Sequence, residues 1–191
     1  MWFNYFEVII MEKEYVIADH ITGEDIKRVR EALKMTQREL AAFLGCAVRT
    51  VENWESKEGR ITGPIVTLTE ILLRKPELAR KLELPANELK LRLWYMYKNT
   101  VCTVIDVDEL SREVMIHNYI GNPLYRAFGV NDMPDFDDYE EFLESRCFPR
   151  ERDKMKFELK KLDIPFYDPV MIIEKTQGRM AEDDFWIRIE R

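Results

Sequence analysis

The chain has 191 residues, of which 46% are hydrophobic and 12% aromatic, and it carries a net charge of −7. This length fits one large or two small domains, the apolar content supports a packed core rather than disorder, and the acidic balance argues against simple nucleic-acid affinity of the whole chain. Three widely spaced cysteines and two histidines form neither a disulfide framework nor a zinc pattern, and no apolar run could span a membrane, so we expect a cytoplasmic protein without cofactor or metal.

The opening residues MWFNYFEVII are apolar but lack the basic leader and the cleavage site of a signal peptide. Two interpretations are open, an added strand or a stretch upstream of a true start at Met11, and the second is slightly favoured. We treat residues 1–20 as an N-terminal extension before the first domain.

Residues 21–85 are predicted to form a domain of five helices. Thr22 is expected to cap the first, in TGEDIKRVREAL, while Pro64 and Pro76 begin the fourth and fifth, because proline suits the first turn of a helix. Residues 21–82 carry 12 Lys and Arg against 9 Asp and Glu, whereas residues 83–191 carry 16 against 23. The helical domain is thus the basic part of an acidic chain, which suggests different partners for the two domains.

Two short helices are expected in the middle of this domain, at about residues 37–44 and 47–56. Thr36 and Glu39 have the spacing of a capping box at the start of the first of them. Gly45 can adopt the positive φ with which a helix often ends. Two short helices joined by so tight a turn are typical of a helix-turn-helix.

After the hinge sequence ELPANE, residues 86–191 are predicted to form a small α+β domain with an antiparallel sheet. LRLWYMY, TVCTVIDV and EVMIHNYI are rich in β-branched and aromatic residues and indicate a meander of three strands. DFDDYEEFLES and RERDKMKFELKKL indicate helices, and a short helix near PVMIIEK and a last strand, FWIRI, follow.

This second domain is interpreted as non-enzymatic. Its acidic stretch alternates with apolar residues at helical spacing, which favours a solvated helix face over an active site. His117 lies in a strand pattern, and Cys147, whose neighbouring arginines could lower its pKa, has no base close in sequence. A nuclease is a further alternative, because ELK at residues 158–160 echoes a carboxylate–lysine pair.

MTQRELAAFLGCAVRTVENWE, residues 35–55, resembles the phage-repressor class of DNA-binding domains, which also occurs in bacterial antitoxins of the MqsA and HigA type. The resemblance covers about residues 21–82, and RITGPIVTLTEILLRKPEL is similar to the antitoxin branch. It implies that the second short helix lies in the major groove of double-stranded DNA. Cys46-Ala47-Val48 departs from the hydroxyl and amide side chains usual there, which leaves base readout by Val48 open.

The outward side chains of this helix are the candidates for reading bases, on the assumption that Ala47, Val51 and Trp54 face the core. Arg49 could donate to guanine, Asn53 could bridge adenine, and Glu52 could accept from cytosine. Arg49 and Glu52 could instead pair with each other on a solvated face.

Phosphate contacts are expected from residues around these. Gln37 and Thr50 lie near helix starts, where the helix dipole favours anions, and Lys57 and Arg60 follow in the next loop. The expected DNA-binding residues are therefore Gln37, Val48, Arg49, Thr50, Glu52, Asn53, Lys57 and Arg60.

The resemblance also implies a structural ion pair. In the resembled domains an arginine late in the first helix pairs with the glutamate that ends the recognition helix. The matching residues are Arg30 and Glu55, so we expect a direct and largely buried salt bridge between them.

The region of residues 91–190 resembles the small N-terminal subdomain of HipA-like kinases. The similarity lies in CTVIDVDELSREVMIHNY and in a turn that matches at Ser145, Arg146, Pro149 and Arg152. It implies a regulator or antitoxin that holds a kinase-like protein partner.

Together these features predict a sequence-specific DNA-binding transcriptional regulator, with an autorepressing antitoxin as one form of it, that binds as a homodimer and has a toxin or kinase-like partner. The alternative is a protein-interaction module that does not bind DNA, such as a toxin-neutralising or phage accessory protein. The many aromatic residues beyond Pro85 predict a protein interface, most simply the homodimer contact, with Trp94 and Met96 exposed on one face of their strand.

Overall fold

The computed structural model describes residues 14–150 and 155–191. The chain divides into two compact units, and the division lies between Glu83 and Leu84. The stretch MWFNYFEVII, and with it the choice between an added strand and an early start, lies outside the described residues. No helix in the described part of the chain is both long enough and apolar enough to cross a membrane.

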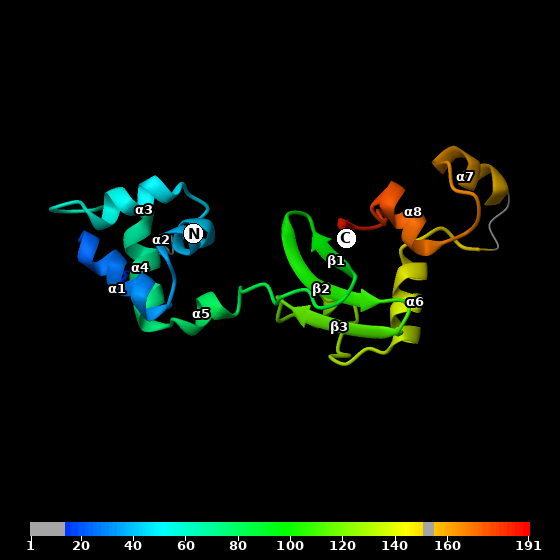
Figure 1. Cartoon of the computed structure of the whole chain (residues 1–191), viewed down its shortest axis with the longest axis horizontal. Coiled ribbons are helices and arrows are strands. Elements are labelled where there is room, and N and C mark those ends of the chain that lie inside the picture. Colours follow the sequence, from blue (N-terminus) through cyan, green and yellow to red (C-terminus); the bar gives the residue numbers. More distant parts are fainter. Residues whose placement is uncertain (1–13, 151–154) are drawn as a thin grey trace, which may run out of the picture. The chain divides into compact units, whose positions relative to one another are not determined.

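The first unit is all-helical, as expected (Figure 1). Its elements are α1 (Gly23–Ala32), α2 (Gln37–Leu44), α3 (Val48–Glu55), α4 (Pro64–Arg74) and α5 (Glu77–Arg80). The Asp25 carboxylate accepts the backbone N–H of Thr22 at 2.9 Å, so α1 begins where the sequence predicts. Pro64 begins α4, whereas α5 is only a single turn.

Buried apolar side chains hold these helices together in two adjoining clusters. One comprises Ile21, Ile26, Leu40, Ala41, Val51, Ile61 and Val66, and the other comprises Val29, Leu33, Leu72 and Ala79. The backbones of Ile21 and Ile61 also form an isolated antiparallel bridge. The segment before α1 is thereby fixed to the loop that follows α3.

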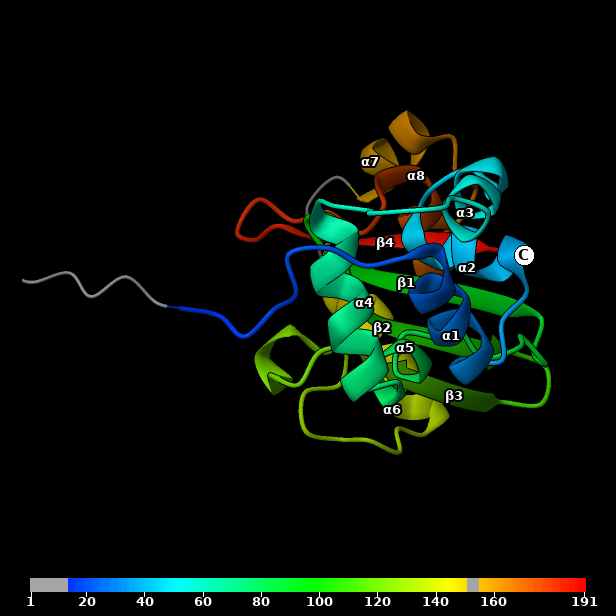
Figure 2. The same cartoon turned by 90° about the vertical axis from the view of Figure 1, so that its left-hand side faces the viewer.

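A four-stranded antiparallel sheet is the base of the second unit. The expected meander consists of β1 (Leu91–Tyr97), β2 (Thr100–Asp108) and β3 (Glu113–Asn118). The last strand, β4 (Phe185–Glu190), pairs with β1, which gives the order β3-β2-β1-β4 (Figure 2). Lys98, at φ 51°, lies in the two-residue turn between β1 and β2.

One face of this sheet is covered by helices. Residues of α6 (Phe136–Ser145), α7 (Met155–Leu162) and α8 (Pro169–Thr176) share a single core with the strands, and a short 3-10 helix, η1 (Pro123–Tyr125), precedes α6. In β1 the buried Leu91, Leu93 and Tyr95 belong to this core. Arg92, Trp94 and Met96 alternate with them and point to the other face.

The outer edge of β4 is partly blocked. The backbone N–H of Ile187 donates to the Gln177 carbonyl at 2.7 Å, and the Arg146 guanidinium donates to the Phe185 carbonyl at 3.1 Å. Gln177 ends α8 in the left-handed region, at φ 58°. These bonds occupy groups that an edge strand would otherwise offer to another chain.

Candidate nucleic-acid interface

Both ends of α2 have the geometry that their residues predict. The Glu39 carboxylate accepts the Thr36 backbone N–H at 2.6 Å, and the Thr36 hydroxyl accepts the Glu39 backbone N–H at 3.2 Å. Gly45 ends α2 in the left-handed region at φ 64°. Ala41, which is buried in the shared core, leaves room for the close crossing of the two helices.

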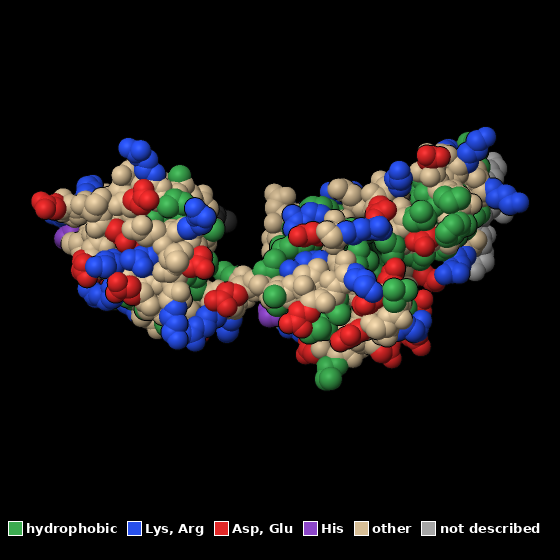
Figure 3. Space-filling view, viewed as in Figure 1, with side chains coloured by type: hydrophobic (Ala, Val, Ile, Leu, Met, Phe, Trp, Pro, Cys, Tyr) green, Lys and Arg blue, Asp and Glu red, His purple; other side chains and the backbone are tan. Residues whose placement is uncertain are grey.

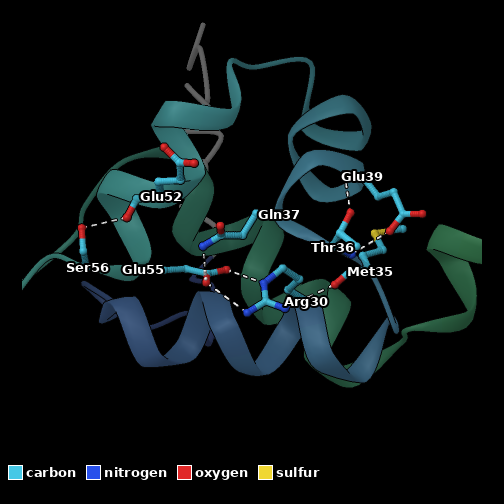
Figure 4. Close-up of polar contacts among 8 residues, drawn as sticks. All are labelled: Arg30, Met35, Thr36, Gln37, Glu39, Glu52, Glu55 and Ser56. Carbon is cyan, nitrogen blue, oxygen red and sulfur yellow. Dashed lines mark hydrogen bonds and ion pairs between the residues drawn. The ribbon is translucent and has the colours of Figure 1, made fainter.

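A polar network fixes α3 against α1 and α2 (Figure 4). Arg30 Nε donates to Glu55 Oε1 at 2.7 Å, and Arg30 Nη2 donates to Glu55 Oε2 at 3.1 Å. Gln37 Nε2, from the first turn of α2, donates to the same Oε2 at 3.0 Å. Arg30 Nη1 also reaches the Met35 carbonyl at 3.3 Å. One carboxylate at the end of α3 thus binds side chains from both preceding helices.

The network is largely buried, and its positive and negative charges pair with each other. The Arg30 and Glu55 side chains are 17% and 8% exposed. Burial opposes ionisation of Glu55, but hydrogen bonds from Arg30 and Gln37 outweigh it and lower the pKa of the carboxyl. Because one amide hydrogen of Gln37 is directed at Glu55, any phosphate contact by this residue would use the rest of its amide.

The outward face of α3 carries the three candidate base-reading side chains. Arg49, Glu52 and Asn53 are all exposed. Within the described residues, none of these side chains makes a hydrogen bond or an ion pair, and Arg49 does not pair with Glu52. The polar ends of all three are therefore available to a ligand.

The positions of Ala47 and Val48 are the reverse of those expected. Ala47 is exposed, whereas Val48 is half-buried and packs against the core that contains Val51. The reason is that Ala47 is the N-cap, at φ −72° and ψ 146°, so the helical phase starts at Val48. Val48 therefore packs partly against the core, and only the rest of its side chain is left for a base contact.

The remaining candidate residues differ in their exposure and in whether they already have an ionic partner. Thr50 is half-buried in the first turn of α3, and Lys57 is exposed just beyond the helix. Arg60 is exposed too, but it forms an ion pair with Asp19. A hydrogen bond with His20 and the charges of His20 and Arg60 lower the pKa of Asp19. Arg60 would thus bring less free positive charge to a phosphate than Lys57.

Gly23 is a structural residue that the sequence analysis missed. A Cβ at this position would lie 2.5 Å from the Trp54 carbonyl oxygen and 2.8 Å from that of Glu55. The first turn of α1 therefore touches the backbone at the end of α3, which only glycine permits. The only local signal is a glycine in the first helical position, which is uncommon enough to suggest a close approach.

Comparison with known families finds a similarity that lies within this first unit. Residues 4–83 match the family model of MqsA, the antitoxin component of a bacterial toxin-antitoxin system. The first unit is MqsA-like. The expected resemblance to the antitoxin branch is thereby confirmed for this part of the chain. No curated protein matches the chain, and the resemblance of residues 91–190 to HipA-like kinases is not confirmed.

Among the described residues of the second unit, the most buried ion pair crosses the face of the sheet opposite the helices. Arg92 Nε and Nη2 each donate to the Asp106 carboxylate at 2.6 Å, and the two side chains are 5% and 9% exposed. Arg92 Nη2 also donates to the Pro85 carbonyl at 2.9 Å. This pair ties the start of the second unit to its central strands.

Trp94 is less exposed on this face of the sheet than the alternation of side chains along a strand predicts. Its indole N–H donates to Glu190 at 3.0 Å, and the Arg188 guanidinium lies 4.3 Å from its ring centroid. Trp94 and Met96 are both half-buried. Neighbouring side chains of the same sheet thus cover part of the surface that was expected to be open.

Arg146, one of the residues of the HipA-like turn, has a structural role here. It donates to both oxygens of Asp183, at 2.7 and 3.0 Å, and to the carbonyls of Gly178 and Phe185. It therefore connects the end of α6 to the segment between α8 and β4.

The residues weighed for catalysis in the second unit lie in different environments. Cys147 is buried, and burial raises the pKa of its thiol to about 12, so the lowering considered from its neighbouring arginines is wrong. His117, on β3, is exposed, and its ring centroid lies 4.6 Å from that of Tyr119, just after the strand. Within the described residues, no group of three or more His, Cys, Asp or Glu side chains is placed to hold a metal ion.

Proposed function

We propose that this chain is an antitoxin that binds double-stranded DNA through α3 and thereby represses transcription of its own operon. The observation that carries the proposal is the outward face of α3, where Arg49, Glu52 and Asn53 are exposed and unpaired within the described residues. Groups of these types read base edges in the major groove. The MqsA family description adds a toxin as the second partner.

The structure around α3 supports this assignment. The network of Arg30, Gln37 and Glu55 fixes the helix without using any of its outward side chains. A rigid helix loses little conformational freedom when it enters a groove, so more of the contact energy contributes to binding. Regulation rather than catalysis is therefore the role that we assign, and it requires no cofactor.

Replacing Arg49 by alanine should weaken binding to the cognate DNA by about 1–3 kcal/mol, because one bidentate contact to guanine is lost. The measurement is a fluorescence-anisotropy titration of the full chain on duplex DNA from the region upstream of its own gene. Affinity of the unaltered protein should also fall steeply as the salt concentration rises.

The matched control is Arg80→Ala, which removes an equally charged, exposed arginine from α5. It should change the affinity by much less than Arg49→Ala. Equal affinities for the unaltered protein, Arg49→Ala and Asn53→Ala would instead favour an interaction module that does not read DNA.

A homodimer is part of the proposal. One recognition helix makes few contacts, and two copies related by a two-fold axis double them on a palindromic site. The MqsA-like unit would then supply the DNA contacts, and the second unit would supply the contact between copies.

A further inference from the structure

The segment that leads into α1 is fixed on the MqsA-like unit at two places. The Val16 carbonyl accepts a hydrogen bond from the Arg74 guanidinium of α4 at 3.3 Å. The N–H of Ile21 donates to the Ile61 carbonyl at 3.0 Å, and the N–H of Ile61 donates to the Ile21 carbonyl at 2.8 Å. Ile61 belongs to the same buried cluster as Val51 of α3. The segment is therefore held beside the loop that follows the candidate recognition helix.

Asp19, near the end of this segment, pairs with the only arginine in that loop. Its Oδ2 forms an ion pair with Arg60 Nη2, and its Oδ1 lies 2.7 Å from His20 Nδ1. The Asp19 and Arg60 side chains are 74% and 63% exposed, so an incoming phosphate can reach the pair. Exposed ion pairs contribute little to folding stability. The pair therefore has more influence on what Arg60 can bind than on whether the domain folds.

The pair neutralises a cation on a surface with only a small positive excess. Figure 3 shows acidic and basic side chains interspersed over the visible face of the first unit, rather than gathered into one basic patch. Around the loop after α3, the charges of Lys57 and Arg60 are balanced by those of Glu58 and Asp19. Removing the charge of Asp19 would leave this loop with a net positive charge beside α3.

We propose that Asp19 competes with the DNA backbone for Arg60: its carboxylate binds the guanidinium in place of a phosphate and thereby lowers the affinity of the protein for duplex DNA. The inference rests on the proposed function, because it concerns the phosphate contacts made beside the same helix. A guanidinium uses the same donors for carboxylate and for phosphate oxygens. A phosphate must therefore displace Asp19 before it gains the full contact with Arg60.

Lys57 provides a contrast within the same loop. It is exposed, and no carboxylate of the described residues lies within ion-pair distance of it. A phosphate can thus bind Lys57 without displacing another group. The end of the N-terminal extension would then set the contribution of one phosphate anchor and leave its neighbour unaffected.

The test is the affinity of the full chain for labelled duplex DNA, measured by fluorescence anisotropy over a range of salt concentrations. A phosphate contact does not depend on base sequence, so a duplex of unrelated sequence is used beside DNA from upstream of the gene. Asp19→Asn should bind both duplexes at least about threefold more tightly than the unaltered protein at about 50 mM salt. The slope of log affinity against log salt should steepen by about 0.9, as expected for one added phosphate contact.

The matched control is Glu77→Gln, which removes one exposed carboxylate from α5 and changes the net charge equally. Figures 1 and 2 show α5 away from α3 within the first unit. This variant should change the affinity by less than about twofold, because salt screens charges that lie far from the DNA. Both variants should unfold at the temperature of the unaltered protein, so that any change in affinity reports on binding.

Arg60→Ala tests whether Arg60 is the group that Asp19 withholds. In the unaltered background this substitution removes a guanidinium that is already paired with a carboxylate. In the Asp19→Asn background it removes one that is available to a phosphate. The loss of affinity caused by Arg60→Ala should therefore be at least about threefold larger in the second background, which is the coupling expected for directly interacting groups.

Two results would overturn the inference. One is an Asp19→Asn variant that gains no more affinity than Glu77→Gln, and the other is an effect of Arg60→Ala that is equal in both backgrounds. If no variant binds either duplex, the proposed function fails together with this inference. If Arg49→Ala weakens binding to the upstream DNA while Asp19→Asn behaves like Glu77→Gln, only the role of Asp19 is refuted.

Discussion

Replacing Asp106 by leucine should lower the free energy of unfolding of the second unit by about 3–5 kcal/mol, because it leaves the Arg92 guanidinium buried without a counter-charge. The loss is expected to be large because both side chains are almost fully buried and are joined by two hydrogen bonds of 2.6 Å. Urea unfolding followed by tryptophan fluorescence measures it, since Trp94 and Trp186 both lie in the sheet.

The double variant Arg92→Met with Asp106→Leu should recover most of this stability. It removes both charges and fills the space with apolar groups, which often equals or exceeds a buried ion pair. The control is Asp184→Ala, which breaks the exposed pair with Lys98 and should cost under about 1 kcal/mol. A single variant no less stable than this control would contradict the prediction.

Replacing Glu55 by alanine should lower the free energy of unfolding of the MqsA-like unit by about 3 kcal/mol, since it strands the partly buried Arg30 and removes the acceptor of Gln37. It should also weaken DNA binding, because α3 loses its bonds to α1 and α2. The comparison is Glu70→Ala, which breaks an exposed pair with Arg74 within α4 and should cost only about 0.3–0.5 kcal/mol.

The same pair predicts a dependence of stability on pH. The pKa of Glu55 is lower in the folded protein than its ordinary value of 4.5, so the folded state favours the charged carboxylate. The contribution of the pair is therefore complete above pH 4.5 and is lost as the pH falls through the lowered pKa. Unaltered protein and Glu55→Ala should converge in stability at acidic pH, and a constant difference down to pH 2 would contradict this.

The features that the sequence predicted well depend on signals within a few residues of one another. Thr36 and Glu39 are three residues apart, and Gly45 ends α2 through its own backbone freedom, so these were readable without a fold. The Arg30–Glu55 pair spans 25 residues and was predicted only because a known family has a similar pair. The meander was readable because its strands follow one another with short turns.

The features that were missed depend on residues far apart in the chain or on the exact residue at which a helix begins. Gly23 is required by the backbone of Trp54, and the Arg92–Asp106 pair depends on the register of β1 against β2. The reversal of Ala47 and Val48 depends on where α3 begins. Ala47 is the N-cap and lies outside the helical spiral, whereas Val48 precedes Val51 by three residues and so shares its buried face.

The position of β4 bears on the order in which the protein matures during synthesis. Strand β1 has β4 as one of its two neighbours, yet 87 residues separate Tyr97 from Phe185. At ribosomal speeds of about 5–20 residues per second, the growing chain waits roughly 4–17 s between the two strands. The MqsA-like unit has left the ribosome in full before that interval begins. A nascent chain would therefore have α3 and the helices around it in place while the sheet of the second unit still lacks its last strand.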